Sequence, residues 1–205
     1  NTFGDDIHIM AGNVATLEGF NDLADWGANS IRVGIGGGSI CSTRIQTGHG
    51  VPTLQSIIDC SKSDRDAALI ADGGIRNSGD IVKCLAAGAD AVILGSLLAS
   101  ASEAPGEVLK DLLTEDGKPI KVYRGMASEE AQMNWRGKVS SEEGVSSTVP
   151  ITGTASEILL SLEKGIRSGL SYSGCNNLLE FSAKSKFIKQ SNAGRIESST
   201  HIKDR

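Results

Sequence analysis

The feature that most constrains the fold of this chain is a unit of buried strand, loop and helix that recurs about every 25 to 40 residues. Apolar strand-like runs are expected at 7–13, 30–35, 67–74 and 91–96, and helical patterns follow the first three at 16–26, 52–62 and 78–87. Gly, Ser, Asp and Cys residues fall just after the strand ends, where barrel active sites are built. The pattern predicts βα units around a parallel sheet, as in half of a (β/α)₈ barrel. A four-stranded open sheet is the alternative.

The second part of the chain departs from this pattern after Leu98. We expect a charged excursion over 107–124, a polar flap over about 125–150, helices at 154–168 and 176–185, and a polar tail over about 187–205. The tail is expected to be disordered or held by a neighbouring subunit. Because the chain opens at Asn1 almost directly into a strand-like run, we interpret residues 1–205 as the C-terminal part of one barrel domain whose N-terminal portion is missing.

Composition excludes several classes of protein. Acidic residues outnumber basic ones, and the net charge of −5 argues against a nucleic-acid binder, which would carry a basic face. No apolar run approaches 18 residues and no signal peptide opens the chain, so we expect a soluble, cytoplasmic protein without membrane contacts. The four cysteines form no CxxC pair, which argues against zinc and against a dithiol centre. Cys60, Cys84 and Cys175 are expected to be small core residues.

The loop after the second expected strand has a different character. Three consecutive glycines, Gly36 to Gly38, allow a tight turn whose N–H groups can face a phosphate, and Ser39 adds a hydroxyl. Cys41 follows two residues later, where a thiol could reach a base attached to the same phosphorylated ribose. The loop alone is equally compatible with a flexible segment and an incidental cysteine.

Two further strand ends narrow this interpretation. Asp72 can accept hydrogen bonds from ribose hydroxyls, and the glycines after it, including Gly74, admit a phosphate to the main chain. The Gly95–Ser96 turn offers a second phosphate contact. Together these turns match the phosphate site that barrels commonly form late in the chain.

The motifs are now specific enough to indicate a family. In order and at family spacing, the chain resembles the IMP dehydrogenase/GMP reductase family at GIGGGSICSTR (34–44), ADGGI (71–75), LGSLLA (94–99), EAPGE (103–107) and YRGM (123–126), and the resemblance runs from about Ile9 to His201. It implies a homotetrameric (β/α)₈ barrel in which this chain supplies about strands 5–8. The family often has Pro where Gly37 stands, which predicts a looser loop here.

The resemblance also implies roles for single residues. Cys41 would form a covalent purine intermediate at C2, assisted by Thr43. The residues expected to bind the substrate, a purine monophosphate (GMP or IMP), are Ser39, Gly74, Gly95, Ser96 and Tyr123 at the phosphate, Asp72 at the ribose, and Gly125, Met126, Ala127 and Glu143 at the base. A nicotinamide cofactor, NADPH or NAD, is implied, and Thr47 is assigned to its binding.

The family contains two reactions, and the residues point both ways. The dehydrogenases have an Arg-Tyr pair in the flap as their water-activating element, and this chain has no such pair between 126 and 150. Glu129 fits the reductase pattern, in which it would be the proton-transfer partner of Thr43. The alternative is that Glu129 only occupies a first helical turn. The Gly95 and Tyr123 motifs and the tail at 193–201 look more like a dehydrogenase.

In dehydrogenases, that tail gives carbonyl oxygens to a potassium ion in the adjacent subunit. The resemblance implies such a site at the carbonyls of Gly36, Gly38, Cys41, Glu197, Ser198 and Ser199. We weigh catalytic residues above scaffold motifs, so GMP reductase leads, IMP dehydrogenase is the alternative, and a non-catalytic purine-nucleotide sensor is third. Glu129→Gln is then expected to lower turnover by roughly 10²–10⁴-fold.

Overall fold

The four apolar runs form a parallel sheet, as the sequence predicts. The computed structural model describes residues 6–200, so residues 201–205 of the expected tail lie outside the described part. The strands are β1 (Met10–Val14), β2 (Ser30–Val33), β3 (Ala68–Asp72) and β4 (Ala91–Ile93), in the order β1-β2-β3-β4. Within this sheet β1 and β4 each pair with one strand only. Four parallel strands in sequence order are what half of a (β/α)₈ barrel would contribute.

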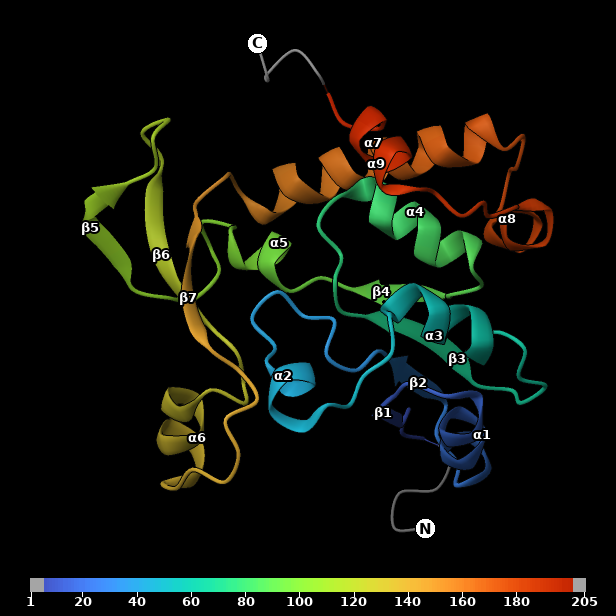
Figure 1. Cartoon of the computed structure of the whole chain (residues 1–205), viewed down its shortest axis with the longest axis horizontal. Coiled ribbons are helices and arrows are strands. Elements are labelled where there is room, and N and C mark those ends of the chain that lie inside the picture. The colour runs from blue at the N-terminus through green and yellow to red at the C-terminus, as the bar shows by residue number, and fades with distance from the viewer. Residues whose placement is uncertain (1–5, 201–205) are drawn as a thin grey trace.

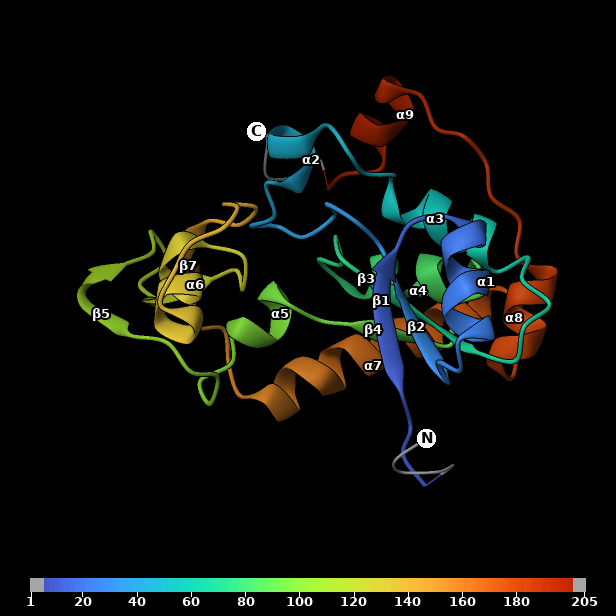
Figure 2. The same ribbon diagram turned by 90° about the horizontal axis from the view of Figure 1, so that it is seen from below.

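Helices follow the first three strands and lie along one face of the sheet (Figures 1 and 2). They are α1 (Leu17–Asp25), α3 (Thr53–Cys60) and α4 (Ser78–Ala86). Two of them begin where a side chain satisfies a free backbone N–H: Thr16 accepts from Gly19, and Asn77 accepts from Asp80. Two short helices that the sequence did not predict, α2 (Thr43–Thr47) and α5 (Ser96–Ala99), begin within the loops that follow β2 and β4.

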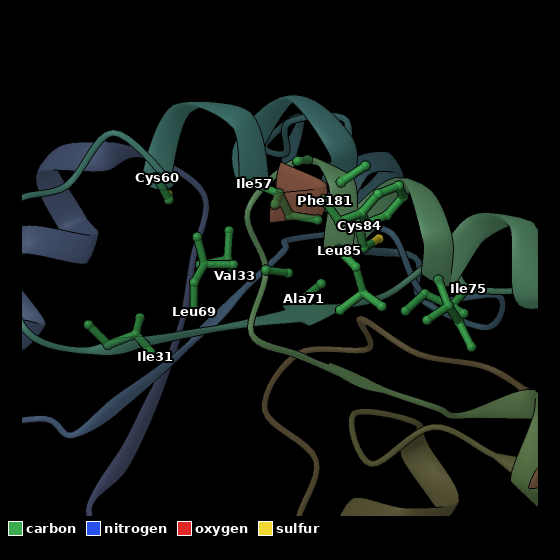
Figure 3. Packing of buried hydrophobic residues seen from close by; sticks show 14 of the residues in the cluster. Ile31, Val33, Ile57, Cys60, Leu69, Ala71, Ile75, Cys84, Leu85 and Phe181 are labelled. Carbon is green, nitrogen blue, oxygen red and sulfur yellow. The ribbon is translucent and has the colours of Figure 1, made fainter. Parts of the chain in front are cut away.

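The core lies between this sheet face and the helices (Figure 3). Ile31, Val33, Leu69 and Ala71 are buried there, and successive residues of a strand point to opposite faces. Arg32 in β2 and Asp72 in β3 therefore point away from the core, toward the face that carries the candidate site. The remaining members of the core include three cysteines, which confirms their expected place: Cys60, Cys84 and Cys175.

The charged excursion and the flap build a second sheet. It is antiparallel, in the order β5 (Val108–Leu113), β6 (Pro119–Arg124) and β7 (Ser146–Pro150), and α6 (Glu129–Arg136) connects β6 to β7. In Figure 1 this sheet and α6 lie across α2 and α5 from the parallel sheet. The expected flap, 125–150, therefore contains one helix, α6, and one strand, β7.

The C-terminal part adds α7 (Ala155–Tyr172), α8 (Leu178–Lys184) and α9 (Asn192–Glu197). Gly165 and Gly169 let α7 approach α4 closely, since a Cβ at Gly169 would lie 2.8 Å from Val82. The expected tail is ordered at α9, where the Gln190 amide donates to the Gly194 carbonyl. Within residues 6–200, none of the helices combines the length and apolar character needed to span a membrane.

Candidate active site

Cys41 lies in the loop that leaves the C-terminal end of β2. It is half-buried, and its N–H donates to the Gly38 carbonyl at 3.2 Å. The other three cysteines are buried in the core, and desolvation raises the pKa of Cys60 and Cys84 to about 11. Of the four thiols, the one at Cys41 is placed where a ligand could reach it.

A chain of hydrogen bonds joins the Cys41 thiol to a carboxylate. Cys41 Sγ donates to Thr43 Oγ1 at 3.2 Å, and Thr43 Oγ1 donates to Glu143 Oε2 at 2.8 Å. The second carboxylate oxygen, Oε1, accepts from Ser141 Oγ at 3.0 Å, which fixes the rotamer of Glu143. This arrangement can move a proton between a group at the thiol and a carboxylate through one hydroxyl.

The main chain explains why Glu143 reaches this position. The segment that carries it runs antiparallel to the loop at 34–42, which we call the cysteine loop. The Ser42 N–H donates to the Glu143 carbonyl at 2.9 Å, and the Val145 N–H donates to the Ile40 carbonyl at 3.0 Å. Cys41 and Gly144 form a bridge between these bonds. The Glu143 carboxylate is thus placed near Cys41 because the backbone of the flap pairs with the backbone of the loop that carries Cys41.

Glu129 is not brought to Thr43. It is the first residue of α6 and is exposed, and it takes part in none of the side-chain hydrogen bonds found within residues 6–200. Its neighbour Glu130 pairs with Arg124 at 2.8 Å. The position agrees with the simpler interpretation, in which Glu129 occupies a first helical turn and interacts favourably with the helix dipole. The expected Thr43–Glu129 pair is replaced by Thr43–Glu143.

The residues expected at the phosphate and ribose line one cavity of about 230 Å³. Two close approaches border this cavity. A Cβ at Gly73 would lie 3.1–3.3 Å from the Gly37–Gly38 main chain, and a Cβ at Gly95 would lie 3.2 Å from the Tyr123 hydroxyl. The cavity is lined by every residue expected at the phosphate and by the expected ribose residue, namely Ser39, Gly74, Gly95, Ser96, Tyr123 and Asp72.

Asp72 is held by two residues that sequence reasoning missed. Its Oδ2 atom accepts from Arg32 Nη2 at 2.7 Å and Nε at 3.2 Å, and from Asn13 Nδ2 at 2.8 Å. Asn13 also donates to the Gly34 carbonyl at 2.8 Å, which ties β1 to the start of the cysteine loop. All these bonds use Oδ2 and fix the orientation of the carboxylate. Within the described residues, Oδ1 accepts no hydrogen bond and is available to a ribose hydroxyl.

The expected base-reading residues are less uniform. Met126 is 74% exposed, and the carbonyls of Gly125 and Ala127 already accept from Ser128 N–H at 3.0 Å and from Gln132 Nε2 at 3.0 Å. Glu143, expected at the base, uses both of its carboxylate oxygens on hydroxyls of this chain. The turn at 125–127 thus lies beside the cysteine loop as expected, with its carbonyls engaged locally.

The residues expected to bind the cofactor and the cation are placed as follows. Thr47, at the end of α2, donates to the Thr43 carbonyl at 2.8 Å and accepts from the His49 N–H at 3.1 Å. Gly36 and Gly38 lie in the cysteine loop. In the described part of the chain, no hydrogen bond joins that loop to the tail residues Glu197, Ser198 and Ser199, and Figure 1 shows α9 apart from α2.

Comparison with known proteins gives one consistent family. The sequence matches the family described as IMP dehydrogenase / GMP reductase domain over residues 1–201. It is 45% identical to an inosine-5'-monophosphate dehydrogenase of Nitrosopumilus maritimus, covering 96% of this chain and 43% of that protein. It is 41% identical to a GMP reductase of Leishmania major, covering 98% of this chain and 42% of that protein.

A solved structure agrees with these relatives. A GMP reductase variant from Trypanosoma brucei, in complex with guanosine 5'-monophosphate, superimposes with a TM-score of 0.89 at 39% identity and covers 97% of this chain and 42% of that one. The chain spans less than half the length of the relatives it matches. The family match covers almost the whole chain, and the solved structure shows that the parallel strands are part of a barrel with the Cys41 loop at their C-terminal ends. This chain belongs to the IMP dehydrogenase/GMP reductase family.

Proposed function

We propose that this chain carries the substrate-binding and cysteine-bearing part of a purine-nucleotide oxidoreductase that converts GMP to IMP with NADPH. The observation that carries the proposal is the chain of hydrogen bonds from Cys41 through Thr43 to Glu143. A thiol can form a covalent bond to C2 of the purine, and a hydroxyl–carboxylate pair beside it can protonate a leaving amine. The Trypanosoma brucei GMP reductase that this chain resembles is seen with GMP bound, which supports the choice of substrate.

The cavity supports the way in which the nucleotide would be held. Its phosphate would lie against Ser39, the Gly74 main chain, the Gly95–Ser96 turn and the Tyr123 hydroxyl, all of which line the cavity. Its ribose would donate to the free Oδ1 of Asp72. This position puts the base toward the cysteine loop, because Gly38 and Ser39 belong both to the cavity and to the loop that bears Cys41.

The reaction then follows from the positions of the side chains. Cys41 gives its thiol proton through Thr43 to the Glu143 carboxylate, and the thiolate adds to C2 of GMP. Thr43 passes a proton from Glu143 to the exocyclic amine, so that ammonia leaves and the carboxylate is left charged. NADPH, which Thr47 is expected to help bind, would supply a hydride to C2 of the thioimidate, and the Cys41 thiolate would leave to give IMP. The flap pairs with the loop through its main chain. Closure of the flap over a bound nucleotide would exclude water, which would otherwise hydrolyse the thioimidate to XMP.

IMP dehydrogenase is the second candidate, because the same Thr43–Glu143 pair could accept a proton from water and activate it. The identity to the Nitrosopumilus maritimus dehydrogenase favours this alternative. A non-catalytic purine-nucleotide sensor is the third. Replacement of Cys41 by Ala separates a sensor from an enzyme: the variant should keep its nucleotide affinity in either case, but only an enzyme has turnover to lose.

A potassium ion and a homotetramer complete the proposal. Within residues 6–200, no group of three or more His, Cys, Asp or Glu side chains could hold a metal ion, so a cation at this loop would bind carbonyl oxygens, which are hard ligands suited to potassium. The Gly38 carbonyl accepts a single hydrogen bond and keeps a lone pair. The carbonyls of Gly36, Gly38 and Cys41 would form half of the site, and Glu197 to Ser199 of a neighbouring subunit the rest.

The deciding experiment follows absorbance at 340 nm with the complete protein that contains this chain. One mixture holds GMP with NADPH, and the other holds IMP with NAD and potassium. A falling signal in the first mixture supports the reductase, and a rising signal in the second makes the protein a dehydrogenase. Omission of potassium from an active mixture tests the cation site, and light scattering tests the tetramer.

A further inference from the structure

Lys121, in the middle of β6, is a buried charge that the proposed mechanism does not use. It is 1% exposed, and none of the ion pairs found within residues 6–200 involves it. Its ammonium donates instead to two main-chain carbonyls, that of Ala104 at 2.7 Å and that of Ala101. Burial of an ammonium without a directly bonded carboxylate is costly, so a cation at this place must do something that an apolar side chain cannot.

The two carbonyls belong to the loop that follows the phosphate turn. This loop, 100–106, comes directly after α5, whose first turn contains Gly95 and Ser96. Its outer side is attached to the segment after β7, since the Ser102 N–H donates to the Gly153 carbonyl at 2.8 Å. Its inner carbonyls, in contrast, point at Lys121. An apolar residue there would leave the Ala104 carbonyl without its donor, and the Ala101 carbonyl would keep only the Ala104 N–H, which donates to it at 3.1 Å.

Lys121 and Tyr123 share one face of β6, because residues two apart on a strand point the same way. Tyr123 lines the phosphate cavity, and its hydroxyl approaches Gly95. One face of β6 therefore contacts the segment 95–106 at two places. Tyr123 approaches the Gly95–Ser96 turn, and Lys121 binds the loop that follows it.

We propose that Lys121 is a positioning residue for phosphate binding. Its ammonium acts as a built-in monovalent cation for the carbonyls of Ala101 and Ala104, and thereby holds the Gly95–Ser96 turn at the spacing from Tyr123 that a phosphate needs. This inference rests on the proposed function for the identity of its ligand, a purine monophosphate.

The test uses the full chain with Lys121→Ala and measures the dissociation constants of GMP and of guanosine. GMP should bind at least about tenfold more weakly, while guanosine should bind as to the wild type, because only the phosphate contacts are displaced. n-Propylammonium, which replaces the three missing carbons and the ammonium, should restore part of the affinity for GMP. The neutral n-propanol should not. Lys118→Ala is the matched control, since Lys118 lies in the same hairpin but is exposed and paired with Asp116.

Three results would overturn the inference: wild-type affinity for GMP in Lys121→Ala, an equal loss for GMP and guanosine, or restoration by n-propanol as well as by n-propylammonium. Lys121→Met, which keeps the side-chain volume, should show the same phosphate-selective loss if the alanine variant does not fold. Failure of both variants to fold would make Lys121 a structural residue only. Inorganic phosphate is the second probe: a wild-type chain that binds phosphate but not GMP would refute the proposed function, and the variants could still be compared with phosphate.

Discussion

Thr43 Oγ1 donates to Glu143 Oε2 at 2.8 Å although the two residues are 100 positions apart in the chain. The same threonine hydroxyl accepts from the Cys41 thiol, so in the described structure it is the only side-chain group between that thiol and the Glu143 carboxylate. The roles of acid and base therefore depend on a contact between the loop after β2 and the segment before β7.

We expect Glu143→Gln to lower turnover by about 10²–10⁴-fold, because the amide keeps the shape of the side chain but cannot exchange the proton. GMP affinity should change little. Steady-state rates and equilibrium binding in the complete protein measure the two effects. Glu129→Gln is the matched control and should be nearly silent, since Glu129 is exposed at the start of α6. A large loss in Glu129→Gln with an active Glu143→Gln would return the role to Glu129.

Asp72→Ala should weaken GMP binding by about tenfold to a hundredfold, because a charged acceptor for the ribose hydroxyls is lost. Asp72 is held by Arg32 and Asn13 through Oδ2 alone, which leaves Oδ1 for the ligand. Calorimetric titration with GMP and with 2',3'-dideoxyguanosine monophosphate measures this. The dideoxy nucleotide should bind wild type and variant alike, and an equal loss for both nucleotides would exclude a ribose contact.

Gly37→Ala should destabilise the protein by about 1–3 kcal/mol, because a Cβ at this position would overlap Thr53 Oγ1 and the neighbouring segments are closely packed. The backbone at Gly37 does not have a positive φ, so the overlap with Thr53 is the main obstacle. Urea unfolding of Gly37→Ala, Thr53→Ala and the double variant forms a double-mutant cycle. The double variant should recover most of the loss, and strictly additive effects would contradict this explanation.

The buried thiols predict a loss of stability in alkaline solution. Desolvation raises the pKa of Cys60 and Cys84 to about 11 in the folded protein, above the value of 9.0 for an unburied thiol. Between about pH 9 and pH 11 the unfolded chain therefore loses these protons while the folded chain keeps them. The free energy of unfolding should fall in this range by up to about 3 kcal/mol for each thiol.

Chemical denaturation at a series of pH values measures this effect, and a Cys60→Ala/Cys84→Ala variant should lack the thiol-dependent part of it. The same burial predicts selective alkylation. At pH 8, iodoacetamide should modify Cys41 in the folded protein and all four cysteines after denaturation. Modification of Cys60 or Cys84 in the folded protein, at the rate of Cys41, would contradict the placement of these residues in the core.

The sequence predicted the strands and the residues at their C-terminal ends well, for a physical reason. Strand ends of a parallel sheet converge, so residues as distant as Ser39, Asp72 and Ser96 could be assigned to one site from local patterns alone. The same reasoning would have found Asn13, a polar residue at the end of the first strand. Arg32 was missed because it lies inside a strand, where its role depends on which face the side chain occupies.

The flap could not be predicted in the same way. Glu129 and Glu143 are both acidic residues in a polar segment, and no local pattern distinguishes the one that reaches Thr43. The choice is made by backbone pairing between 40–42 and 143–145, a long-range contact, and by α6, which turns Glu129 outward. Short helices such as α2 and α5 were also missed, because they are shorter than a recognisable amphipathic period.

The flap segment that pairs with the cysteine loop also carries the Glu143 carboxylate. Glu143 is held at Thr43 by the pairing of its segment with Ile40 and Ser42, so any movement that separated the two segments would also take the carboxylate away from the thiol. One set of backbone hydrogen bonds therefore sets both the position of the carboxylate and how closely the segment at 143–145 lies against Cys41.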